Sequence, residues 1–158
     1  MQKTDEIVPF PSLLWFERVA KPVDAERARH EHLGYIDCVA GFCVTDADEG
    51  PWTAQVTFEE FAVVDLREEA PADAERADFT LEAPLAVWRE MIESVEAGGG
   101  RPDLEHTLNR LSHMGTPMRL AGDDPLRRDL YFRYNQSLQE FLNAAGGFTT
   151  KFPAVEAE

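Results

Sequence analysis

The sequence predicts an α+β fold in which helices cover one face of a mostly antiparallel sheet. Two observations support this prediction. Apolar residues alternate with polar ones through most of residues 35–83, which is typical of half-buried strands, and recur every three or four residues after Pro84, which is typical of amphipathic helices. A run of strands followed by a run of helices favours α+β over alternating βαβ units. The 158 residues suit one domain, 1–158.

The N-terminal segment, residues 1–34, is predicted to be helical. Residues 11–20, PSLLWFERVA, form an apolar patch that suits a short helix. Residues 23–34 suit a second helix with Asp24 as N-cap, although the apolar face of this helix is weak. His30 and His32 are two positions apart and would point to different faces, so we expect no metal between them.

The strands are expected in the next fifty residues. Residues 35–50 suit one strand, in which Gly41 would mark a bulge or bend. Residues 52–69 alternate in two phases, and the phase changes at the glutamates 59–60. A tight hairpin turn there is preferred, and a long bulged strand is the alternative. Residues 79–83 then supply the last strand of a meander.

Helices dominate the rest of the chain. The first helix is predicted to begin at Pro84, where an apolar stripe with helical spacing starts, and to end at the glycines 98–100. A short helix opens at Pro102, an extended stretch spans 117–122, and the longest helix precedes a C-terminal tail, 146–158, that we expect to be extended or loose. The apolar stripes are Leu85, Trp88, Met91, Ile92 and Val95; Leu104, Leu108 and Leu111; and Leu126, Leu130, Tyr134, Leu138, Phe141 and Leu142.

Composition excludes several classes of function. A formal net charge of −15 argues against nucleic acid and anionic lipid surfaces as partners. No run approaches the about 20 apolar residues of a membrane span, and the acidic N-terminus does not suit an export signal, so we expect a cytoplasmic protein without membrane insertion. Cys38 and Cys43 are too few for a disulfide framework and are expected to be reduced thiols. Arginine outnumbers lysine, which hints at a bacterial genome rich in G and C.

The sequence offers no catalytic or metal-binding motif. It lacks a nucleophile elbow, a phosphate-binding loop and a dinucleotide fingerprint. The acidic stretch 46–51 lacks the ligand spacing of a calcium loop. His106 and His113 could share one helix side, but no nucleophile is paired with either. We therefore expect no enzyme activity, no metal and no cofactor.

Large flexible apolar side chains are the remaining chemical signal. Met91, Met114 and Met118 occur in the helical half together with Trp88 and Phe132. Methionine adapts to irregular surfaces, and aromatic rings offer broad contact area. These residues either fill a core or form the wall of a pocket, and periodicity alone does not distinguish the two.

Two stretches of the second half follow a strand-to-helix pattern. Residues 77–92, ADFTLEAPLAVWREMI, combine a strand with a helix, and 108–130, LNRLSHMGTPMRLAGDDPLRRDL, combine a short helix, a strand and the start of a final helix. Both stretches resemble the corresponding parts of the sterol-carrier-protein type 2 family of lipid-binding domains, and the resemblance covers residues 35–145. Residues 118–123 match the family's short strand phrase. The chain departs from the pattern in having Glu-Glu at the hairpin turn and an insertion over 96–102.

The resemblance implies a five-stranded sheet with a hydrophobic tunnel beneath the helices, which would hold a fatty acyl chain or a sterol, without metal or redox cofactor. Carried over to this chain, it implies ligand-binding residues on three apolar helix faces: Trp88, Met91, Ile92, Leu104, Leu108, Leu111, Phe132, Leu138 and Phe141.

Two alternatives stay open. The same fold with a filled core could dimerise or dock on a partner enzyme, as related domains appended to enzymes do, and the sheet edge and the patch of Trp15 and Phe16 are the candidate surfaces. A small isomerase-type enzyme is a weaker alternative, because such folds usually place their helices before a long curved sheet.

Overall fold

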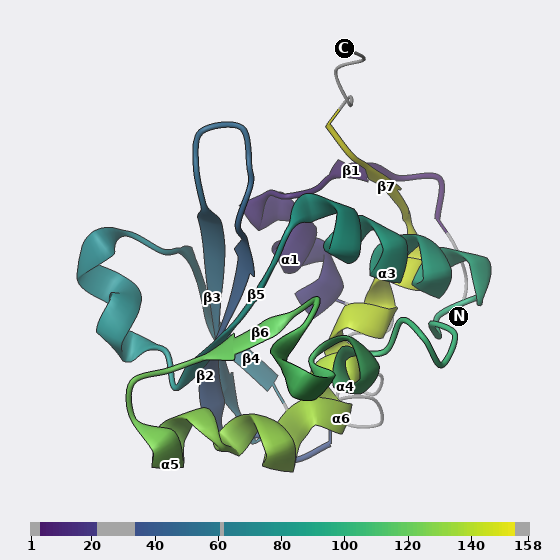
Figure 1. The fold of residues 1–158 in the computed structure, drawn as a ribbon. Coiled ribbons are helices and arrows are strands. Elements are labelled where there is room, and N and C mark those ends of the chain that lie inside the picture. Colours follow the sequence, from purple (N-terminus) through teal and green to yellow (C-terminus); the bar gives the residue numbers. More distant parts are fainter. Residues whose placement is uncertain (1–3, 22–33, 61, 154–158) are drawn as a thin grey trace.

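A five-stranded sheet with strand order β4-β3-β2-β5-β6 forms the centre of the molecule (Figure 1). The computed structural model describes residues 4–21, 34–60 and 62–153. The strands are β2 (Cys38–Val44), β3 (Trp52–Glu59), β4 (Ala62–Glu68), β5 (Phe79–Ala83) and β6 (Arg119–Ala121). The predicted α+β class is confirmed.

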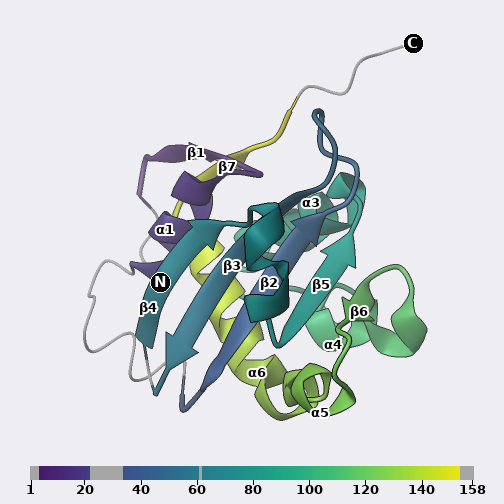
Figure 2. The same cartoon turned by 90° about the vertical axis from the view of Figure 1, so that its left-hand side faces the viewer.

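The sheet is mixed. Its β2–β3, β3–β4 and β5–β6 pairs are antiparallel, whereas β2 and β5 run parallel. The predicted meander is therefore wrong, because β5 lies beside β2 and not beside β4. The chain reaches that position through a crossover that carries the 3-10 helix η1 (Pro71–Arg76) over the outer face of the sheet (Figure 2). A parallel pair requires such a crossover, since a tight turn joins only antiparallel strands.

The β3–β4 hairpin is formed as predicted. Glu60 has a left-handed φ of 56° at the turn. Thr57 pairs with Asp65 but Phe58 pairs with Val63, so Val64 is an extra residue on β4. The phase change in the sequence therefore has two causes, a turn and a bulge.

Gly41 causes no break in strand pairing, so the predicted bulge is absent. It lies in the uninterrupted registers of β2 with β3 and with β5. A Cβ atom at Gly41 would lie 2.5 Å from Thr80 Oγ1. The glycine is needed because the Thr80 side chain leans over β2 at this point.

Helices α1 (Leu13–Ala20), α3 (Leu85–Ala97), α4 (Leu108–Leu111) and α6 (Leu130–Asn143) cover the inner face of the sheet. The short helix α5 (Pro125–Arg128) contacts β5 and α6. The helices predicted over 11–20 and after Pro84 are confirmed. The helix predicted over 23–34, with Asp24, His30 and His32, lies outside the described residues except for Gly34.

Two helix boundaries differ from the prediction. The helix expected from Pro102 begins only at Leu108, where the Thr107 hydroxyl caps it by accepting from the Arg110 N–H. The longest predicted helix is divided at Asp129 into α5 and α6. In both segments, the side chains that face inward therefore differ from those that the sequence predicts.

Within the described part of the C-terminal tail, Thr149–Lys151 is extended, as predicted, and also paired, whereas Gly146 and Gly147 end the 3-10 helix η3 (Ala144–Gly147). Strand β7 (Thr149–Lys151) runs parallel to β1 (Ile7–Pro9), forming a separate two-stranded sheet. The Trp15 indole N–H donates to Thr150 Oγ1 at 3.0 Å, which ties the tail to α1. Trp15 and Phe16 are fully buried in the core, so the expectation that they form a docking surface is wrong.

Candidate functional site

The candidate site is the apolar interface between the sheet and the helices. Helix α3 contributes its first wall. The Leu85 N–H donates to Asp46 Oδ1 at 2.7 Å, which fixes the start of the helix against the turn after β2. From this start, helical spacing buries Trp88, Met91 and Ile92 on one side of the helix. For Trp88, the prediction that the stripe faces the sheet is confirmed by its hydrogen bonds to β2 and β5.

Trp88 fastens α3 to the two parallel strands. Its indole N–H donates to the carbonyl oxygens of Cys43 at 2.9 Å and Ala83 at 3.1 Å. Both acceptors lie near the carboxyl ends of β2 and β5. Trp88 is therefore a fixed part of the wall as well as an apolar one.

Aromatic rings fill the part of the interface next to α1. The Phe42 ring lies 5.5 Å from Phe16, 6.2 Å from Trp88 and 6.1 Å from Phe141 between centroids. The Phe141 ring also meets Phe58 edge to face at 5.2 Å. These contacts leave each ring enclosed by others, so this region is packed core.

A second part of the interface is lined by aliphatic and sulfur-containing side chains. We call it the aliphatic end, and it consists of Met91 on α3, Leu108 and Leu111 on α4, Met118 before β6, and Leu138 on α6; all are buried. Methionine has three rotatable bonds and a polarizable sulfur, so it repacks more easily than a ring. The aliphatic end is therefore the more adaptable part of the wall.

The single turn of α4 covers the aliphatic end on its outer side. The Leu108 N–H donates to Gln139 Oε1 at 2.7 Å. At the other end of α4, the hydroxyl oxygens of Ser112 and Tyr131 are 2.8 Å apart. Burial raises the pKa of the Tyr131 hydroxyl, and the hydrogen bond with Ser112 partly offsets that rise. These polar contacts hold α4 on α6.

The other predicted site residues have different positions. Ile92 and Phe141 are buried in the wall, whereas Leu104 is 84% exposed and Phe132 is 63% exposed. Leu104 precedes the helix that was expected to turn it inward. Tyr131 packs on Phe79 at 5.7 Å, and the next helical residue, Phe132, then points about 100° away, toward solvent. Neither Leu104 nor Phe132 lies between sheet and helices.

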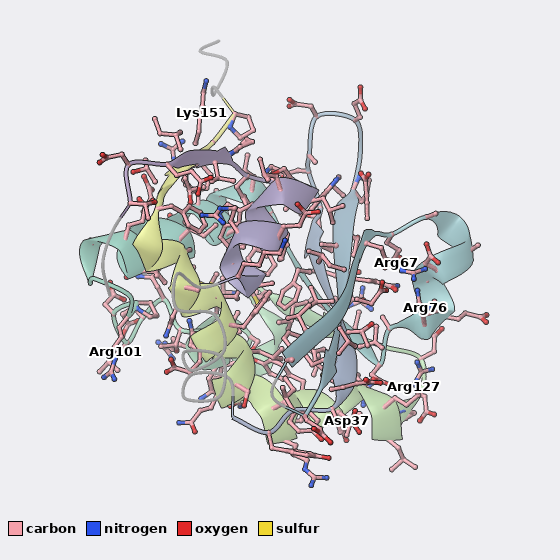
Figure 3. The ribbon with its side chains drawn as sticks, turned by 180° about the vertical axis from the view of Figure 1, so that it is seen from behind. Asp37, Arg67, Arg76, Arg101, Arg127 and Lys151 are labelled. Carbon is pink, nitrogen blue, oxygen red and sulfur yellow. The ribbon has the colours of Figure 1, made fainter. Side chains whose placement is uncertain are left out.

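A separate acidic groove is lined by residues of η1, β5, β6 and α5. Figure 3 labels Arg127 of α5, which lines this groove, and Arg76 of η1. The groove measures about 470 Å³. The guanidinium of Arg127 crosses it, donating to Asp78 Oδ1 at 2.9 Å and to backbone carbonyls of residues 75–77. Among the described residues no group of three or more His, Cys, Asp or Glu side chains could hold a metal ion. The carboxylates that line the groove are Glu69, Glu75, Asp78, Glu82, Asp123 and Asp124.

The sequence analysis missed this groove because its residues come from strands and loops that are distant in the chain. In the sequence, Asp123 and Asp124 alone suggest only the N-cap of the following helix. Asp124 does cap α5, accepting from the Leu126 N–H at 3.0 Å. The crossover of η1 is what brings these segments to one face.

The thiols are buried, and neither has an activating base among the described residues. Burial raises the pKa of Cys38, and nearby Asp78 and Asp37 raise it further. Burial also raises the pKa of Cys43, and a hydrogen bond with Thr53 partly offsets this rise. A nucleophilic cysteine needs a lowered pKa. The raised pKa of each thiol instead favours the protonated, unreactive form.

No helix among the described residues is long and apolar enough to cross a membrane. No protein-family model matches the sequence, and no curated protein matches it.

Two solved structures share the fold. The crystal structure of sterol carrier protein 2 superposes with a TM-score of 0.58 and 18% identity, covering 84% of this chain and 94% of that chain. The solution structure of a conserved hypothetical protein from Thermus thermophilus, described as a possible sterol carrier protein, also gives a TM-score of 0.58, with 17% identity over 92% of each chain. The α+β architecture of this chain is therefore that of the sterol-carrier-protein-2-like fold.

Proposed function

We propose that this protein is a non-catalytic binding and carrier domain for a hydrophobic ligand, a fatty acyl chain or a sterol-like molecule, held between sheet and helices. The observation that carries the proposal is the aliphatic end, an adaptable apolar wall closed on its outer side by the single turn of α4. The fold supports it, because one structural neighbour is sterol carrier protein 2.

Apolar burial would supply the affinity. Each Å² of apolar surface removed from water contributes about 25 cal/mol, and a long acyl chain provides enough area to offset the loss of motional freedom on binding. Room for the acyl chain would come from rotamer changes at Met91 and Met118, both of which are fully buried. The ring-packed region next to α1 would stay unchanged.

The wall formed by the described residues offers no group suited to catalysis. The ionisable residue beside the aliphatic end is Tyr131, whose hydroxyl is paired with Ser112 and whose pKa is raised by burial. We therefore propose binding without chemical conversion and without metal or cofactor. The buried free thiols of Cys38 and Cys43 fit a reducing compartment, and we propose the cytoplasm.

Native mass spectrometry of protein purified without detergent tests this function. We expect bound masses that denaturing extraction identifies as apolar molecules. Leu111→Trp would fill the aliphatic end and lower the bound fraction, whereas Leu104→Trp, at an exposed position, would not. A folded wild-type protein that neither carries nor takes up acyl chains or sterols would refute the proposal.

A docking module is the second candidate function. The observation in its favour is a group of exposed apolar side chains in the helical half: Leu104, Met114, Leu126 and Phe132. The edge strand β4 is less suited to this role, because its bulge at Val64 disturbs pairing with a further strand. Light scattering after size exclusion separates the two candidates, because a ligand-free dimer that Phe132→Lys dissociates would favour docking.

A further inference from the structure

The segment that leads into α4 is held by a histidine between two carboxylates. His106 Nδ1 lies 2.7 Å from Asp103 Oδ1, within its own turn. His106 Nε2 lies 3.8 Å from Glu90 Oε2 on α3. The imidazole therefore faces acceptors on both sides, one in the turn and one on the helix that forms the ligand wall.

The turn itself has a further attachment to α3. The Asp103 N–H donates to Ser94 Oγ at 2.8 Å. The Asp103 carboxylate also accepts from the Glu105 N–H at 3.0 Å, which shapes the turn. Residue 107 then caps α4, and the Leu108 N–H bonds to α6. Residues 103–108 thus bridge α3 and α6 on the outer side of the aliphatic end.

We propose that His106 is a proton-operated latch that fastens this bridge to α3 and so controls the opening of α4. The charged imidazolium has two N–H donors and can serve both carboxylates, whereas the neutral ring has one donor and can serve only one. Histidine changes charge between about pH 5 and 8. A protonated ring therefore closes the latch, and a neutral ring loosens it.

The charged groups around the His106 ring favour tighter contact when the ring is protonated, because most of them are carboxylates. Glu90 faces it from α3, and Asp103 and Glu105 belong to the same turn. Arg110 on α4 is engaged with Glu105 Oε2 at 3.5 Å. The hydrogen bond with His106 is the largest cause of the lowered pKa of Asp103, which favours the ionised carboxylate as the partner of the ring. The His106 side chain is 29% exposed, which gives solvent protons access to it.

Amide hydrogen exchange on the ligand-free protein tests the latch without reference to ligand. The readout is the protection of the Leu108 and Leu111 amides at about pH 5.5 and about pH 8, corrected for intrinsic exchange. We expect protection about two- to five-fold higher at the acidic pH, the range set by partly exposed ion pairs. His106→Gln and Glu90→Gln should each remove this difference.

His113→Gln is the matched control, because His113 follows α4 and its side chain makes no hydrogen bond or ion pair within the described part of the chain. It should leave the pH difference intact. A wild-type protein without the difference, or a His106→Gln protein that keeps it, would overturn the latch.

A second measurement addresses ligand access and rests on the proposed function. The release rate of a neutral fluorescent sterol probe should be higher at about pH 8 than at about pH 5.5, and His106→Gln should make release fast at both. Absence of probe binding at either pH would contradict the proposed function, while the exchange data would still decide the latch. Binding with equal release rates in both proteins would show that the latch does not control access.

Discussion

The indole nitrogen of Trp88 on α3 lies 2.9 Å from the carbonyl oxygen of Cys43 on β2 and donates a hydrogen bond to it. The same N–H reaches the carbonyl of Ala83 at 3.1 Å, at the last paired residue of β5. One side chain therefore joins the helical layer to both strands of the parallel pair. The wall of the candidate site takes its position from this contact.

Trp88→Phe keeps an aromatic ring in the wall but removes the donor. The carbonyl oxygens of Cys43 and Ala83 each lose one donor, but the Ala83 oxygen still accepts from the Thr45 N–H. We therefore expect a loss of about 0.5–1.5 kcal/mol in the free energy of unfolding. Urea denaturation measures it. Trp52→Phe is the control, since the indole of Trp52 makes no hydrogen bond within the described residues. Equal losses in the two variants would contradict the role given to the Trp88 N–H.

Gly41→Ala should destabilise the sheet by overlap rather than by backbone strain. The new methyl group would lie 2.5 Å from Thr80 Oγ1 and 3.1 Å from Thr80 Cβ. We expect a loss of about 1–3 kcal/mol. Thr80→Ala removes the closest atoms, so the double variant should be more stable than the sum of the single losses predicts. Strictly additive losses in a double-mutant cycle would exclude this contact as the cause.

Arg127→Ala should loosen the crossover on the outer face of the sheet. It removes the hydrogen bond to Asp78 and those to the carbonyls of residues 75–77. Because the Arg127 side chain is partly exposed, the expected loss in unfolding free energy is only about 1 kcal/mol. Exchange of the Asp78 amide, which donates to the carbonyl oxygen of Val39, should quicken more than that of core amides. Arg119→Ala, which removes an exposed pair with Glu82, should leave that amide unchanged.

The buried thiol of Cys38 predicts a loss of stability at alkaline pH. Its pKa is raised in the folded state, mainly by burial, so the folded protein keeps a proton that the unfolded chain releases above about pH 8.5. The native state then binds more protons than the unfolded state, and the unfolding free energy falls by about 1.4 kcal/mol per pH unit. Urea titrations between about pH 8 and 10 measure this slope.

Cys38→Ala should reduce that slope, although it also removes core packing and lowers stability at every pH. Thiol labelling gives an independent readout, because both cysteines should react slowly in the folded protein and rapidly in urea. Fast labelling of Cys38 under native conditions would contradict its assignment as a protected thiol.

Local patterns in the sequence determined the identity of most elements. Alternation with a period of two marked β2, β3 and β5, and the change of phase marked the β3–β4 turn. Helical periodicity marked α3 and predicted that Trp88, Met91 and Ile92 face the sheet. These features were predictable because burial of an apolar stripe depends on residue spacing within a single element.

The tertiary structure alone decided how those elements meet. The parallel pairing of β5 with β2, the pairing of β7 with β1 and the acidic groove all join segments distant in the chain, and no local period encodes such neighbours. The exposure of Leu104 and Phe132 followed from where α4 begins and how Tyr131 packs. Sequence spacing sets which residues share a face of an element, whereas long-range packing decides which of those faces is buried.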